Sequence, residues 1–131
     1  MFLSPHEARA LLPYVDPARM RGEFPVGLRD GALLCLISVD VLAEELPGLR
    51  APAFTMEHGR LRVTLERVGV EWIVILPRDH EARLLAWLTA RRLWSTEEHV
   101  ITGPKGPLSQ SAIYKLLRRY ARKARRSRST R

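Results

Sequence analysis

Apolar and polar positions along the chain predict two helices in its first half. Residues 4–12 open with Ser-Pro-His-Glu, a capping box with proline at the first helical position, so a short helix is expected to run up to Pro13. Residues 28–46 are apolar nearly all round between residues 32 and 43, which is typical of a buried central helix. The Pro-Gly pair that follows should end this helix.

The middle of the chain changes to a period of two residues. Residues 60–66 alternate between apolar and polar side chains, which predicts a strand with one face on the core and one in water. A Val-Gly pair follows, and residues 70–76 are then apolar on both faces, so the second strand of this hairpin is expected to be buried. Residues 53–56 are predicted to add a short third strand.

Two further helices are expected in the second half. Asp79 should cap a helix that runs to about Leu93, with four large side chains turned inward: Leu84, Leu85, Trp87 and Leu88. After a Gly-Pro-Lys-Gly-Pro loop, Ser109 should cap the last helix. The apolar stripe of that helix consists of Ile113, Leu116, Leu117, Tyr120, Ala121 and Ala124.

These elements predict an α+β domain, mostly α-helical with a small antiparallel sheet. With 131 residues, of which 46% are hydrophobic, the chain can bury one core. It contains no internal repeat and no low-complexity linker. A single domain is therefore expected over residues 1–126, followed by a basic, disordered tail at residues 127–131.

Positive charge is concentrated near the C-terminus. Residues 1–98 hold 12 basic and 14 acidic side chains, a net charge of −2, whereas residues 99–131 hold 10 basic and no acidic ones, a net charge of +10. A basic block at one end of a chain is typical of nucleic-acid binding, because each neutralised phosphate releases a counterion. The candidate DNA contacts are Lys115, Arg118, Arg119, Arg122, Lys123, Arg125, Arg126 and Arg128, and the candidates for a second contact are Arg60, Arg62 and Arg67 on the hairpin. Phosphate contacts position a protein without reading the base sequence.

The sequence predicts no cofactor and no metal site. Cys35 lies in an apolar run and is expected to be a buried, inert thiol, and a single cysteine cannot form an intrachain disulfide. The histidines, His6, His58, His80 and His99, lack metal-ligand spacing and are interpreted as solvent-facing. Tyr120 lies on the apolar stripe and is interpreted as a core tyrosine rather than a nucleophile.

The ends and the apolar runs of the chain bear on its location. The N-terminus has no basic segment followed by an apolar one, and no apolar run approaches the roughly 20 residues of a membrane span. No membrane association is expected. The lone cysteine fits a reducing cytoplasm.

Five short segments carry motifs whose order and spacing are informative. They are residues 3–12, residues 28–34 with Arg-Asp-Gly-Ala-Leu-Leu, residues 45–50 with Glu-Leu-Pro-Gly-Leu-Arg, residues 75–77 with Ile-Leu-Pro, and residues 107–109 with Pro-Leu-Ser. Together they resemble the catalytic domain of tyrosine recombinases, the phage-integrase family. The resemblance covers nearly the whole chain but only the first half of that domain.

The resemblance also implies that catalytic groups are missing. It places Leu42 at the position of the family's first catalytic arginine, and Asp40 where a glycine is expected. The hairpin turn has no lysine, and Arg67 is the cation there, although a guanidinium is a poor proton donor. The family's His-x-x-Arg box, second histidine and nucleophilic tyrosine have no counterpart in the sequence. We therefore expect that this chain is not an enzyme by itself.

The expected function is that of a catalytically inactive, recombinase-like DNA-binding protein. One alternative is a protein-interaction module that regulates a full-length recombinase, with the basic helix against an acidic surface. Another is a decayed integrase fragment. A homodimer is also expected, because residues 32–43 and the second strand of the hairpin form apolar surface that the absent half of the domain would otherwise cover.

Overall fold

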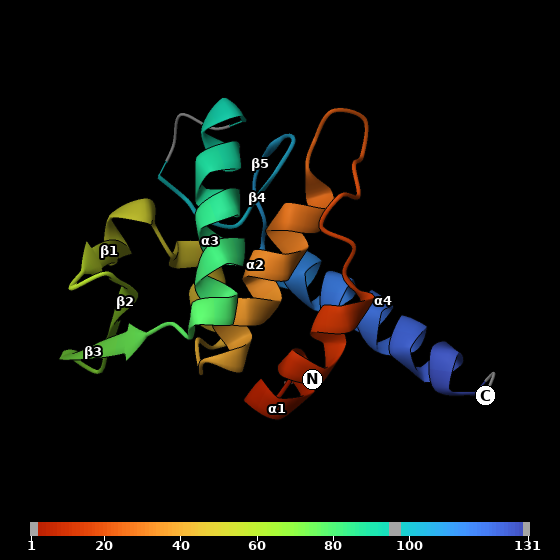
Figure 1. The fold of residues 1–131 in the computed structure, drawn as a ribbon, viewed down its shortest axis with the longest axis horizontal. Coiled ribbons are helices and arrows are strands. Elements are labelled where there is room, and N and C mark those ends of the chain that lie inside the picture. Colours follow the sequence, from red (N-terminus) through yellow and green to blue (C-terminus); the bar gives the residue numbers. More distant parts are fainter. Residues whose placement is uncertain (1–2, 95–97, 130–131) are drawn as a thin grey trace.

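The computed structural model describes residues 3–94 and 98–129, and it has four helices grouped beside a small sheet (Figure 1). Helix α2 (Val26–Ser38) lies at the centre and packs against α1 (Pro5–Leu11) and α3 (Arg78–Ala90). The expected α+β architecture, mostly helical with a small antiparallel sheet, is confirmed.

Helix α1 begins as its sequence predicts. The Ser4 hydroxyl accepts a hydrogen bond from the Glu7 amide, and the Glu7 carboxylate accepts one from the Ser4 amide, both at 3.1 Å. Pro5 occupies the first helical position. A 3-10 turn, η1 (Leu12–Tyr14), follows directly, so the chain bends where Pro13 was expected to end the helix.

Helix α2 is shorter than predicted. It ends at Ser38 instead of continuing to residue 46, and the chain then forms the 3-10 segment η2 (Ala43–Gly48). The Ser38 hydroxyl donates to the Cys35 carbonyl oxygen at 2.7 Å, a local hydrogen bond that competes with helix continuation. Asp40 then adopts a left-handed conformation with φ 75°, which aspartate tolerates better than most residues. Beyond Ser38, Val41 is therefore buried in a loop and Ala43 and Leu46 are buried in η2, whereas Leu42 is exposed.

The predicted burial of α2 is confirmed, and it removes one argument for a dimer. Leu33, Leu34 and Leu36 are completely buried within the chain, as is Cys35, whose thiol pKa burial raises to about 12. This part of residues 32–43 is covered by the protein's own helices. It does not supply the open apolar face that self-association was expected to cover.

The sheet has the predicted pairing. Strands β1 (Phe54–Glu57), β2 (Arg60–Arg67) and β3 (Val70–Ile75) form an antiparallel sheet in the order β1-β2-β3, with Leu65 opposite Trp72. The third strand predicted from residues 53–56 is present as β1. Alternate residues of β2 are buried, as its pattern predicts.

The predicted burial of β3 is wrong. Its apolar side chains Val70, Trp72, Ile73 and Ile75 are each about half exposed. In the described part of the chain, β3 pairs with β2 alone and forms an edge of the sheet, at the side of the molecule away from the helices (Figure 1). An apolar run read along one strand cannot show whether another layer covers it. Leu76, which returns the chain to the helices, is fully buried.

Helix α3 departs from its prediction at its start and on one face. Pro77 precedes the helix without a side-chain cap, and Asp79 lies inside the first turn instead of capping it. Leu84 and Trp87 are buried as expected, whereas Leu85 is 38% exposed. The 3-10 turn η4 (Arg91–Leu93) continues to the predicted end.

The last helix, α4 (Gln110–Ser129), follows a minimal hairpin of β4 (Thr102–Gly103) and β5 (Gly106–Pro107). The Ser109 hydroxyl caps it by accepting from the Ala112 amide at 3.2 Å. Residues 127–129 are helical, so the expected disordered tail does not begin at residue 127, because the run of Arg, Lys and Ala contains no helix breaker. The remaining two residues of that expected tail lie outside the described part of the chain.

Gly27 brings the start of α2 against the loop before it. A Cβ atom at Gly27 would lie 2.0 Å from the Asp16 carbonyl oxygen, and the Gly27 amide donates to the Arg19 carbonyl oxygen at 3.0 Å. The substitution Gly27→Ala should lower the free energy of unfolding by about 1–3 kcal/mol in a denaturant titration, because the loop must move. Gly48→Ala meets no heavy atom within 4 Å and should change stability by less than about 0.5 kcal/mol. Equal effects of the two substitutions would contradict this close approach.

Candidate nucleic-acid interface

Helix α4 divides into a buried and a basic face. Ile113, Leu116, Leu117, Tyr120 and Ala124 are buried, and Ala121 lies at the edge of this face. At about 100° per residue, the cationic positions form an arc on the opposite side. The structure exposes seven of the eight predicted contacts on this arc, named here the basic stripe: Lys115, Arg118, Arg119, Arg122, Lys123, Arg125 and Arg126. The side chain of the eighth, Arg128, lies outside the described residues.

No acidic side chain of the same helix offsets the positive charge of the basic stripe. Helix α4 contains no acidic residue, and neighbouring cations stand four positions apart, as Arg118 and Arg122 do. Each like-charge pair at this spacing disfavours the helix by about 0.2–0.5 kcal/mol. Among the described residues, no carboxylate lies within 4.0 Å of Arg118, Arg119 or Arg122. The stripe therefore carries a strong positive potential that an external anion would relieve.

Tertiary contacts fix the orientation of α4. The helix packs against η2, η1 and α1, and the Lys123 ammonium donates to the Tyr14 carbonyl oxygen at 3.2 Å. Beyond this contact its C-terminal end projects from the body of the protein (Figure 1). The stripe is thus presented on a helix with a defined direction.

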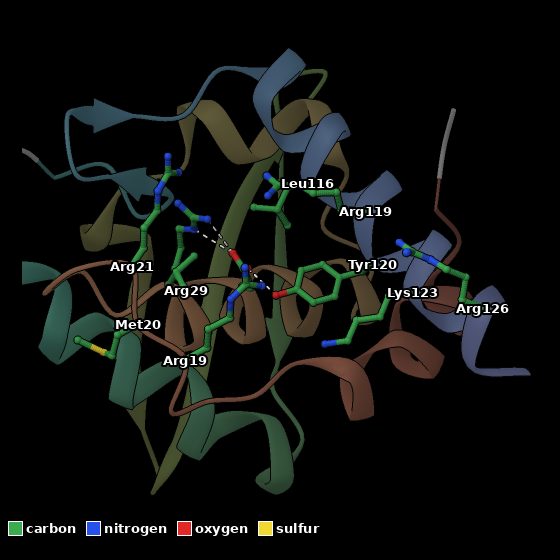
Figure 2. Close-up of a pocket in the computed structure, with 11 residues that line it drawn as sticks. Arg19, Met20, Arg21, Arg29, Leu116, Arg119, Tyr120, Lys123 and Arg126 are labelled. Carbon is green, nitrogen blue, oxygen red and sulfur yellow. Dashed lines mark hydrogen bonds and ion pairs between the residues drawn. The ribbon is translucent and has the colours of Figure 1, made fainter. Parts of the chain in front are cut away.

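The strongest link between α4 and the core is a buried chain of three side chains. The Tyr120 hydroxyl donates to Asp30 Oδ2 at 2.6 Å, and the Arg29 guanidinium binds Asp30 Oδ1 at 2.9 Å (Figure 2). Arg29 also lies over the Phe24 ring, 5.4 Å from its centroid. Burial, and then the hydrogen bond to Asp30, raises the pKa of Tyr120 well above its usual value. The interpretation of Tyr120 as a core residue is confirmed, and a raised pKa is the opposite of what activates a nucleophile.

The arginines of the hairpin are engaged within the protein. Arg67 makes a two-pronged ion pair with Glu45 at 2.9 and 2.7 Å, and it donates to the Asp40 carbonyl oxygen at 2.6 Å. Arg62 pairs with Glu57. Arg60 donates to the Leu76 carbonyl oxygen at 3.0 Å. These contacts, set by strand register and by the η2 loop, leave the hairpin poorly suited to be the second phosphate contact that the sequence indicated.

The positions that the resemblance compares with catalytic residues lie close together in the fold. Leu42 directly precedes η2 and is 43% exposed, and its amide donates to the carboxylate of Glu45 at 2.8 Å. The Glu45 carboxylate also accepts hydrogen bonds from Arg67, and these are the main reason why the pKa of Glu45 is lowered. The Arg67 guanidinium is therefore already bound by Glu45 and by the Asp40 carbonyl oxygen.

One histidine differs from the expectation that all four side chains face solvent. His80 is buried rather than solvent-facing, and burial lowers the pKa of its imidazole. Over the described residues, no group of three His, Cys, Asp or Glu side chains is placed to hold a metal ion. No described helix is both long enough and apolar enough to cross a membrane.

Sequence reasoning missed the surroundings of the basic stripe. Arg19 and Arg21 lie in the loop before α2, yet they line the same cavity as Arg119, Lys123 and Arg126 (Figure 2). The partners Asp30 and Tyr120 are 90 positions apart in the chain, so no local pattern joins them. The Arg-Asp pair at the start of α2 was the available signal, since two adjacent charges at the head of an otherwise apolar helix require partners.

Comparisons with known proteins support the fold. No protein-family model matches the sequence, and no curated protein resembles it significantly. The structure is similar to that of XerA recombinase, with a TM-score of 0.68 and 20% sequence identity over 95% of this chain and 43% of that chain. It is also similar to XerH site-specific recombinase bound to difH substrate in a pre-cleavage complex, with a TM-score of 0.70 and 26% identity over 93% of this chain and 36% of that chain.

These similarities have a limited extent. Both solved proteins are tyrosine recombinases, so the resemblance seen in the sequence motifs is confirmed at the level of fold. This chain spans less than half the length of either protein. The fold is similar to that of part of these recombinases, at most 43% of the chain compared.

Tyr120→Phe should destabilise the protein because it leaves Oδ2 of the buried Asp30 carboxylate without the donor shown here. A loss of about 1.5–3 kcal/mol in the free energy of unfolding is expected at neutral pH, from urea titration. Tyr114→Phe is the matched control, since the Tyr114 hydroxyl accepts an exposed hydrogen bond from Gln110.

The same two variants test the direction of the Tyr120 pKa. Above about pH 10 an unfolded tyrosine ionises while the folded Tyr120 retains its proton, so wild-type stability should fall as pH rises through this range. The Phe variant at position 120 should lose this component and the control should keep it. An identical alkaline dependence in both variants would contradict the assignment.

Proposed function

We propose that this protein is a catalytically inactive, recombinase-like DNA-binding protein that grips backbone phosphates with the basic stripe of α4. The observation that carries the proposal is the exposure of seven cations on one side of a helix without acidic residues. Arg and Lys side chains that follow one side of a helix can neutralise several phosphates of a duplex. The similarity to XerH, whose structure is a complex with its difH substrate, supports nucleic acid as the partner.

The proposal implies binding without strong sequence preference. Arg and Lys contacts to phosphates set position and orientation, whereas base specificity requires side chains that enter a groove. The stripe consists of cations throughout, and its positive potential acts equally on any duplex. We therefore expect affinity to depend on salt far more than on sequence.

Catalytic inactivity is the second part of the proposal. Stabilising the charge of a phosphoryl transition state requires fixed donors at the reacting phosphate. Leu42 has none, and the nearby Arg67 guanidinium is bound to Glu45. Tyr120 is buried with its hydroxyl on Asp30. None of these groups is arranged for strand cleavage.

A protein partner is a second candidate, favoured by the exposed apolar strand β3. Val70, Trp72, Ile73 and Ile75 are half exposed on an edge strand, a surface that natural proteins usually cover or charge. Its occupant would be a full-length recombinase or a second copy of this chain. Such an apolar contact survives high salt, whereas phosphate binding does not.

Binding to duplex DNA should weaken steeply with salt. If four to six cations of the stripe engage at once, the slope of log affinity against log salt should be about −4 to −5 in fluorescence anisotropy. The double substitution Arg118→Gln, Arg122→Gln should reduce the magnitude of this slope by about 2, because two phosphate contacts are lost.

The control for this measurement is a hairpin arginine. Arg62→Gln removes a cation that pairs with Glu57 and should leave the slope unchanged. Failure to bind at low salt would refute the DNA proposal, and so would an unaltered slope in the double variant.

Incubation with a nicked suicide substrate should yield no covalent protein–DNA adduct, because Leu42 offers no guanidinium, Arg67 is bound to Glu45 and Tyr120 is buried. The measurement is a denaturing gel with labelled DNA, beside an active tyrosine recombinase on its own substrate. An adduct that is resistant to denaturant and absent from Tyr120→Phe would show that the chain retains catalysis.

A further inference from the structure

A concave basic cavity, distinct from the outer part of the stripe, lies between α4 and the loop of residues 19–21. Its volume is about 700 Å³, within the range of small-molecule sites. Arg19 and Arg21 approach from the loop on one side, and Arg119, Lys123 and Arg126 from α4 on the other (Figure 2). We call this cavity the α4 basin.

The α4 basin has an unbalanced charge. Arg29 adds a sixth cation, and Asp30 is the acidic residue in the described lining. Both carboxylate oxygens of Asp30 are already bound, one by Arg29 and one by Tyr120. The cations from the loop and from α4 thus face a hollow that contains no free carboxylate, and a concave wall focuses their potential. This arrangement selects an anion with more than one charge.

The loop backbone and the Arg29 side chain are in place before any ligand arrives. Hydrogen bonds from the Arg19 amide to the Asp16 carbonyl oxygen and between the Arg21 and Phe24 backbones fix the loop, at 2.9–3.1 Å. The Gly27 amide ties the Arg19 carbonyl to the start of α2. Arg29 is 7% exposed and is oriented by Asp30. Arg29 and the loop backbone therefore lose little conformational entropy on binding.

The wall of the basin is not uniformly polar. Met20 is 52% exposed although cations flank it on both sides along the chain, and Val26 and Leu116 line the same hollow. The Tyr120 ring lies between the two groups of cations (Figure 2). Inorganic anions gain nothing from such surface. An anion that also carries a flat or apolar part can cover it.

We propose that the α4 basin binds nucleotide phosphates, with the phosphate groups between the loop and α4 cations and the nucleoside against the exposed Met20 side chain. The nucleotide is either a free nucleoside polyphosphate or the phosphorylated end of a DNA strand, which offer the same chemistry. A continuous duplex cannot enter a hollow of this size, so the inference goes beyond the proposed function and does not rest on it.

Calorimetric titration of the whole protein at physiological salt tests the basin, with ATP, inorganic triphosphate and adenosine as separate probes. ATP should bind more tightly than triphosphate, because the apolar wall adds to the charge, and adenosine should bind weakly. The double substitution Arg19→Gln, Arg21→Gln should weaken ATP binding about tenfold or more. Both side chains are exposed, so folding should be unaffected and a matching melting curve confirms this.

The matched control removes the same charge outside the basin. Arg118→Gln, Arg122→Gln should bind ATP as the wild type does while losing duplex affinity, so the two sites fail separately. Absence of ATP binding would overturn the proposal, as would equal affinity for ATP and triphosphate or equal losses in the two double variants.

Competition against ATP identifies the source of the nucleotide. If single-stranded oligonucleotides with a 5′-phosphate displace ATP and those with a 5′-hydroxyl do not, the basin takes a strand end. If neither displaces it, the ligand is a free nucleotide. Displacement by both alike would mean that general backbone charge occupies the basin, which would contradict the proposal.

Discussion

The position of α4 depends on the buried hydrogen-bonded chain of Arg29, Asp30 and Tyr120. A carboxylate inside a protein is costly unless it is paired and hydrogen-bonded, and Asp30 meets this condition through a guanidinium on one oxygen and a phenol on the other. One partner is its neighbour in α2 and the other comes from the last helix. Because Tyr120 must reach Asp30, α4 packs with its Tyr120 face turned toward α2.

That setting determines what the cations of α4 can do. With Tyr120 turned inward, the rest of the helix surface presents Arg and Lys to the outside over several turns. One edge of this surface, with Arg119 and Lys123, borders the loop before α2 and forms a hollow. The other, with Arg118, remains convex. The same helix thus offers two positively charged surfaces of different shape, one for the proposed duplex contact and one for the proposed nucleotide.

At the hairpin, in contrast to α4, the arginines are bound by groups of the protein itself. Arg67 and Glu45 join the β2 end to η2 in a partly buried, two-pronged pair, and this pair stabilises the loop that contains Leu42. A guanidinium committed to a carboxylate in this way is a structural group. The exposed apolar side chains of β3 lie beside it, with Trp72 under the Arg67 guanidinium at 5.7 Å. This end of the protein is suited to apolar contact rather than to phosphate.

The sequence by itself determined the order of elements, because capping residues and periodicity act over a few positions. The Ser4–Glu7 capping box, the alternation in β2, the cap at Ser109 and the two faces of α4 all follow from neighbours within one or two turns. The candidate stripe was predictable for the same reason. Helix length was less predictable, since the Ser38 side-chain hydrogen bond and the left-handed residue Asp40 end α2 inside an apolar run.

Tertiary structure alone decided what lies next to what. The exposure of β3, the burial of His80, the neutralised hairpin arginines and the basin with Arg19 and Arg21 depend on contacts between distant segments. Apolar periodicity reports that a side chain avoids water, but it does not say which layer covers it. Charge along the chain likewise reports cations, whereas their pairing depends on which carboxylates the fold brings within reach.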